Sequence, residues 1–139
     1  MKAGATIHDY AIDQMNRLLT TLAFQIHRAA KKPGAVEIHD LRVSIRRFSQ
    51  GLLLFMDFFP KWEVKKIKRM LKRMMQLTSE IRNRDIAIEY LVDLKATTHQ
   101  RRLEKERIHY QRRFAEMVRR WSARDFSAKW RIRLSLRTV

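Results

Sequence analysis

The chain has 139 residues, with 31 lysine and arginine residues against 14 aspartate and glutamate residues, which gives a net charge of +17. A chain of this length is expected to form one domain, residues 1–139, and to bury about two-thirds of its surface. The excess of positive charge indicates a polyanionic partner, and nucleic acid, inorganic polyphosphate and an anionic membrane surface all qualify.

The sequence contains no cysteine, which excludes disulfide bonds and thiol chemistry and is compatible with a reducing cytosol. Its N-terminus has no apolar segment typical of a secretory signal, and its longest apolar run, residues 52–56, is too short to span a membrane. We therefore expect a cytoplasmic protein without membrane insertion. Only three glycines and two prolines interrupt the chain, so long helices are expected.

Two amphipathic helices are predicted in the N-terminal half, over residues 6–32 and 36–58. Thr6 is the expected N-cap of the first helix, with Asp9 three residues later as an acidic variant of a capping box. The second helix should end before Pro60, because a residue that precedes proline avoids the helical conformation. Their apolar stripes are Ala11, Met15, Leu18, Leu22 and Ile26 in the first helix, and Leu41, Ile45, Phe48, Leu52 and Phe55 in the second.

The second helix also carries a basic stripe beside its apolar stripe, with His39, Arg42 and Arg46 at positions i, i+3 and i+7. Arg47 extends this basic surface on the other side. Guanidinium groups suit phosphate because they donate two parallel hydrogen bonds and stay charged at any ordinary pH. Asp40 can neutralise only one of the three arginines, so positive charge remains.

A third helix is predicted over residues 61–94, and its basic face is the strongest functional signal in the sequence. Residues 61–73 contain seven basic residues and one acidic residue. An ordinary solvated helix face would carry matching acids, so their scarcity favours anion binding. The sector opposite the apolar stripe holds Lys61, Lys65, Lys68, Lys72, Ser79 and Arg82, and Lys66, Arg69 and Arg73 widen it.

A fourth helix is predicted over residues 98–123, and Arg107 interrupts its apolar stripe. Asp85 lies close to the apolar stripe of the third helix and needs a partner if it is buried. We predict that Arg107 pairs with Asp85 or Glu80. Four amphipathic helices with short connections predict an all-α fold, an antiparallel four-helix bundle.

The tail, residues 124–139, alternates apolar and polar residues toward its end, which is a strand period without a second strand to pair with. Two interpretations remain open. The tail is either a mobile or helical end that covers part of the bundle, or a strand that contacts another chain.

Two sequence motifs resemble those of the CHAD family, the conserved histidine α-helical domain. Residues 39–47, HDLRVSIRR, resemble the opening motif of the family. Residues 80–86, EIRNRDI, resemble its second motif, Arg-Asp-x-Asp-Val, with Asn83 in place of the first aspartate and Ser79 where a glycine is common. The resemblance covers roughly residues 6 to 123.

The resemblance implies that full-length relatives contain two such bundles, related by a pseudo-twofold axis, with a positively charged channel between the halves. This chain supplies half of a full-length CHAD domain, because no second His-x-x-Arg-x-x-x-Arg pattern follows Arg84. We therefore expect a homodimer that restores the two-bundle arrangement. The resemblance also makes inorganic polyphosphate the expected ligand, which would associate the protein with polyphosphate granules.

The residues expected to bind polyphosphate are the basic residues of the second and third helices. His39 belongs with them, and two interpretations stay open for it, a structural hydrogen-bonding residue or a direct ligand contact. Asp40, Asp85 and Arg107 are expected to orient the set. The predicted direct contacts are Arg42, Arg46, Arg47, Lys65, Lys68, Lys72 and Arg82, with Lys66, Arg69 and Arg73 as a second tier.

We expect no catalytic activity, no metal and no cofactor. The five histidines form no recognised ligand spacing, the acidic residues are scattered, and no glycine-rich phosphate loop is present. One alternative is a nucleic-acid-binding bundle, although the aromatic residues fall mostly on core stripes, which argues against base recognition. Another is an accessory subunit of a phosphate-processing enzyme, because in the family this module often accompanies a triphosphatase domain.

Overall fold

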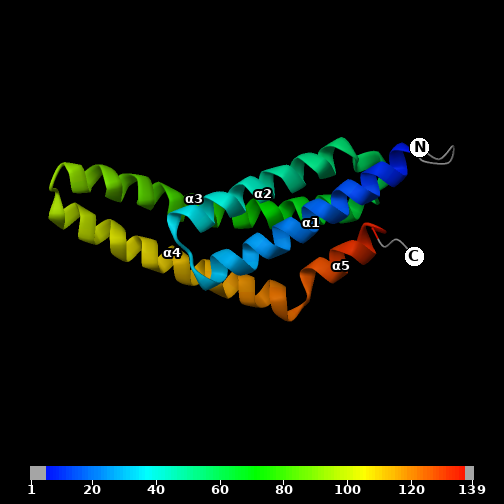
Figure 1. The fold of residues 1–139 in the computed structure, drawn as a ribbon. Coiled ribbons are helices and arrows are strands. Elements are labelled where there is room, and N and C mark those ends of the chain that lie inside the picture. The colour runs from blue at the N-terminus through cyan, green and yellow to red at the C-terminus, as the bar shows by residue number, and fades with distance from the viewer. Residues whose placement is uncertain (1–5, 137–139) are drawn as a thin grey trace.

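The computed structural model describes residues 6–136, and these residues form helices and no strand. The α-helices are α1 (Ile7–Lys31), α2 (Ala35–Leu54), α3 (Lys61–Asp93), α4 (Thr97–Ala123) and α5 (Phe126–Arg133), and a short 3-10 helix, η1 (Met56–Phe58), follows α2. Figure 1 shows two helical hairpins, α1 with α2 and α3 with α4, and α2 packs against α3. The chain is therefore an all-α helical bundle, as the sequence predicts.

One core of apolar side chains holds the helices together. All five apolar residues predicted to form the stripe of α2 are buried. In α1, Leu19 is buried, whereas Leu18, which the sequence analysis selected, is half-buried. Gly51 lets α2 approach α1 closely, because a Cβ atom at this position would lie 2.6 Å from the Sδ atom of Met15. The α1–α2 hairpin therefore gives α3 a closely packed surface to lie on.

The helix ends follow local chemistry. The predicted capping box is present, because the Thr6 hydroxyl accepts a hydrogen bond from the Asp9 amide and the Asp9 carboxylate accepts one from the Thr6 amide, each at 3.2 Å. The second helix ends earlier than predicted, at Leu54, and η1 follows it. This 3-10 turn lets the buried Phe55 and Phe59 both enter the core, and Phe59 is extended, as expected for a residue before proline.

The tail folds as a helix that covers the bundle. Its apolar anchors, Phe126, Trp130 and Leu134, are buried and spaced by four residues, a helical period that the alternating pattern hides. The Trp130 ring stacks on Phe48 of α2 with 5.8 Å between the ring centroids. The strand interpretation is therefore wrong for α5. Residues 137–139 of the predicted tail lie outside the described residues.

The far end of the α3–α4 hairpin extends beyond α1 and α2 (Figure 1). Buried residues of α3 end at Ile81, and those of α4 begin at Phe114. As predicted, Arg107 pairs with Asp85 and so joins α4 to α3, and its Nη2 also donates to the Pro33 carbonyl at 2.6 Å. We call residues 85–107, which begin and end at this ion pair, the hairpin tip.

Candidate anion-binding site

A groove of about 700 Å³ lies between α2 and α3, and we call it the α2–α3 groove. Its floor is apolar and includes Ile45, Val64 and Leu71. Among residues 6–136, no acidic side chain lines it. The basic side chains that line it are Arg46 from α2 and Lys61, Lys65, Lys68, Arg69 and Lys72 from α3.

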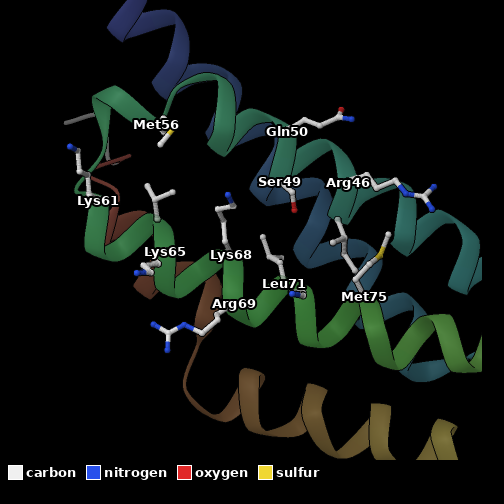
Figure 2. A pocket seen from close by; sticks show the side chains of 13 residues that line it. Arg46, Ser49, Gln50, Met56, Lys61, Lys65, Lys68, Arg69, Leu71 and Met75 are labelled. Carbon is white, nitrogen blue, oxygen red and sulfur yellow. The ribbon is translucent and has the colours of Figure 1, made fainter.

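The lysines converge because of helical spacing. Lys61, Lys65, Lys68 and Lys72 lie at i, i+4, i+7 and i+11, so they form one row along the side of α3 that faces α2. Figure 2 shows Lys68 reaching into the space beneath α2, where Ser49 points toward it. The row spans about 16 Å at the helical rise of about 1.5 Å per residue.

Arg42 joins α2 to α3 near this groove. Its Nη1 donates hydrogen bonds to the Met75 carbonyl at 2.9 Å, to the Thr78 hydroxyl at 3.1 Å and to the Ser79 hydroxyl at 2.7 Å. These bonds hold a half-buried guanidinium group in one position. The two hydroxyl acceptors come from adjacent residues of α3, so Arg42 fixes the register between the two helices.

Three arginines repel one another at this position. Burial lowers the pKa of Arg42 below its usual value, and the nearby charges of Arg46 and Arg82 lower that pKa further. No carboxylate among residues 6–136 forms an ion pair with any of the three. Arginine still keeps its charge at neutral pH, because its ordinary pKa lies far above neutrality. A bound anion would relieve this repulsion.

Asp40 does not act as the sequence analysis expected. Its carboxylate pairs with Arg28 of α1 at 2.8 Å, and not with Arg42, Arg46 or Arg47. Arg28 also lies 3.7 Å from the Glu37 carboxylate, so its guanidinium group ties α1 to α2 at two positions. All three arginines of the basic stripe are therefore left without a carboxylate partner among the described residues.

The structure distributes the residues predicted to bind polyphosphate over four groups. Arg46, Lys65, Lys68, Lys72 and Arg69 line the α2–α3 groove, and Arg42 and Arg82 form the arginine cluster beside it. His39 and Arg47 are exposed on α2 but line neither this groove nor the one described next. Lys66 and Arg73 lie in a second groove on the other side of α3, so the structure separates them from their neighbours in sequence.

This second groove has a volume of about 670 Å³ and lies between α3, the end of α4 and α5, and we call it the α3–α5 groove.

Three polar residues near the first groove were not predicted from the sequence. They are Ser49 and Gln50, which line the α2–α3 groove, and Thr78, whose hydroxyl accepts a hydrogen bond from Arg42. A signal existed for Ser49, because it follows Arg42 and Arg46 at the helical spacings i+7 and i+3.

Within residues 6–136, no three histidine, cysteine, aspartate or glutamate side chains gather as a metal site would require. Over the same part of the chain, no helix is both long and apolar enough to cross a membrane.

The family model of the CHAD domain matches residues 14–138, nearly the whole chain. The match begins inside α1 and extends through α5, so it reaches further toward the C-terminus than the resemblance over residues 6 to 123. No curated protein and no solved structure matches the chain.

Proposed function

The chain belongs to the CHAD family, and from this premise we propose that it binds inorganic polyphosphate in the α2–α3 groove without catalysing a reaction. Linear polyphosphate is a flexible chain of negative charges with no apolar side groups. Its recognition therefore needs a row of cations at close spacing and little else. In a cell, this ligand would hold the protein in the cytoplasm, at polyphosphate granules.

One observation carries the proposal. The α2–α3 groove brings six basic side chains together with no acidic side chain on its lining within the described residues. Cations held this close repel one another, and the folded chain tolerates that repulsion more easily when an anion is bound. The neighbouring cluster of Arg42, Arg46 and Arg82 continues the positive surface beyond the lysine row.

The lining of the groove favours polyphosphate over nucleic acid. Proteins that bind single strands stack bases on aromatic side chains. The described lining of the α2–α3 groove contains no aromatic side chain, and its uncharged floor is built from aliphatic residues and methionines such as Leu71 and Met75. A chain of phosphates needs no stacking partner, so the basic side chains of the groove are sufficient to bind it.

A double charge reversal tests the proposal. Lys68→Glu with Lys72→Glu should lower polyphosphate affinity at least tenfold and leave the helical circular dichroism unchanged, because both side chains are exposed. The matched control is Arg112→Glu with Arg113→Glu, which changes the net charge equally at two exposed residues outside both grooves. If the two variants lose polyphosphate affinity equally, binding depends only on the net charge of the protein, and the groove is rejected as the site.

A competition experiment separates the two ligand classes. Long-chain polyphosphate should displace labelled DNA from the protein at equal charge concentration. If DNA instead binds at least tenfold more tightly, the nucleic-acid function replaces the one proposed here.

We also propose that two copies form a homodimer through the hairpin tip. The tip carries five basic and five acidic residues, so the rest of the chain carries the whole excess of +17. Two copies repel each other least at this neutral end. Its exposed apolar side chains would be covered by the partner, and they are Ile86, Tyr90, Val92 and Leu94.

The charges of the tip suit a twofold axis. On the α3 side the exposed charged residues of the tip are Glu89 and Asp93, whereas the α4 side carries the exposed Arg101, Arg102 and Lys105 and one exposed acid, Glu104. In a twofold pair, the acidic side of one copy can face the basic side of the other. Gel filtration at micromolar concentration should give twice the chain mass of 16.8 kDa, and Tyr90→Glu with Leu94→Glu should return it to the single-chain value. A wild-type mass of one chain would reject the dimer.

A further inference from the structure

The α3–α5 groove is a second strongly basic surface. It is lined by Lys66 and Arg73 from α3, by Arg120 from α4, and by Arg124 and Lys129 from the C-terminal segment. Arg69 of α3 also lines it. No acidic side chain among residues 6–136 is part of its lining, and none of these six basic residues forms an ion pair with a described carboxylate.

One further cation of this groove differs from the others. Arg133 of α5 lies 3.8 Å from the Glu63 carboxylate, so its charge is offset. Glu63 is half-buried at the start of α3, where it holds α5 against the bundle. The groove therefore contains one arginine with a carboxylate partner and six basic residues without one. This distribution is expected when the six residues bind an anionic ligand.

Arg69 connects the two grooves. It lines both of them, and Figure 2 shows its side chain turned to the opposite side of α3 from Lys68. Lys65 and Lys66 show the same division, because one lines the first groove and the next residue lines the second. Basic side chains thus follow one another around α3, from one groove to the other.

We propose that the α3–α5 groove is a second phosphate-binding site, which receives the same polyphosphate chain once that chain is long enough to pass over α3. The inference rests on the proposed polyphosphate function. A helix with its side chains is about 10–12 Å across, so a short polyphosphate fills one groove and cannot reach the other. A longer chain presents its free end to the second groove at an effective concentration in the millimolar range. The protein therefore selects long chains.

The test compares tripolyphosphate with long-chain polyphosphate on the full-length protein. The variant with Lys66→Gln, Arg73→Gln and Arg120→Gln should bind tripolyphosphate as tightly as the wild type and bind the long chain at least tenfold more weakly. Its salt dependence should change as well. For the long chain, the slope of log affinity against log salt should become shallower by about 2, because each lost contact with a single strand removes about 0.7.

A matched control removes the same number of positive charges as the groove variant, but outside both grooves. Lys32→Gln, Arg112→Gln and Arg113→Gln remove three exposed basic residues that line neither groove. This control should retain both affinities and the wild-type salt slope for the long chain. If it loses long-chain affinity as strongly as the groove variant, the length effect is general charge attraction and the second site is rejected.

The remaining outcomes separate this inference from the proposed function. In one outcome, the α3–α5 groove variant binds the long chain as the wild type does, while Lys68→Glu with Lys72→Glu lowers the affinity for both ligands. Polyphosphate would then bind only in the first groove, and only the inference would be overturned. Unchanged tripolyphosphate binding in that double variant would overturn the proposed function itself. The exposed Trp62 at the α3–α5 groove provides a further check. If Trp62→Ala weakens the binding of single-stranded DNA and leaves polyphosphate binding unchanged, the second groove binds nucleic-acid bases and the inference fails.

Discussion

The body of the bundle and the hairpin tip are built partly from the same two helices, yet they differ in burial and in charge. In the tip, no residue is buried, and basic and acidic residues are equal in number. In the body, α3 packs against α2 and α4, and the whole excess of positive charge lies outside the tip. The excess of positive charge thus lies in the part of the chain where neighbouring helices form grooves, whereas in the tip basic and acidic residues balance.

Ion pairing follows the same division. At the junction with the tip, Asp85 pairs with Arg107, and Arg84 pairs with both Glu80 and Glu106. These pairs replace the apolar core where that core ends. Arg84 also lies 4.7 Å from the centre of the Tyr110 ring, and the two carboxylates raise its pKa even though its burial opposes this. Charges near the tip therefore serve the fold, whereas the basic side chains of the grooves, apart from Arg133, have no carboxylate partner within the described chain.

The largest expected effect concerns the core of the body. Trp130→Ala should lower the free energy of unfolding by about 3–5 kcal/mol, because it removes a buried ring that packs on Phe48, Trp121 and Phe126. Urea denaturation measures the loss. Tyr90→Ala in the tip, studied where the chain is monomeric, should change stability by less than about 0.5 kcal/mol, since this side chain is 70% exposed. Similar losses at both positions would remove the distinction between body and tip.

Salt should weaken ligand binding in the body much more than dimerisation through the tip. Six contacts with a flexible polyanion give a salt slope of about 4, so a fourfold rise in salt should weaken polyphosphate binding about 300-fold. Dimerisation through the neutral tip should not weaken comparably, because salt also screens the repulsion between the two basic bodies. Titrations and sedimentation at two salt concentrations measure both quantities. A dimer that dissociates as steeply as the ligand would place the interface on the basic surface instead.

A smaller effect is expected at the junction of the two regions. Asp85→Ala leaves the Arg107 side chain, which is 19% exposed, without its carboxylate partner and should lower the free energy of unfolding by about 1–3 kcal/mol. Hydrogen exchange should become faster in residues 85–107 while the core of the body keeps its protection. Glu89→Ala, at an exposed position of the tip, is the control and should change neither. Equal loosening of the core would mean that the tip is not a separate unit.

The smallest expected effect comes from a substitution that keeps the charge. Arg42→Lys loses the planar group that bonds Met75, Thr78 and Ser79, so stability should fall by about 1–2 kcal/mol. Polyphosphate affinity should fall by less than tenfold, because the ammonium still attracts phosphate. Denaturation and titration of the same variant test both statements. A loss as large as that of the lysine double reversal would make Arg42 a principal ligand contact.

Several features could be predicted from the sequence because they depend on local spacing. The apolar stripe of α2, the capping box at Thr6 and the pairing of Asp85 with Arg107 all follow from helical periodicity and from the cost of burying an unpaired charge. The tail shows where this approach ends. The alternation of apolar and polar residues in the tail hid three apolar residues spaced by four. The helix is evident only in the structure, where Trp130 stacks on Phe48 of α2.

The sequence by itself determined an all-helical chain with an uncompensated basic face, because composition and a period near 3.6 residues are properties of the chain alone. The tertiary structure decided which basic residues act together. Lys65 and Lys66 are consecutive in sequence, but a turn of about 100° per residue places them on different sides of α3. Only the placement of α2 on one side, and of the end of α4 with α5 on the other, turns those two sides into separate grooves.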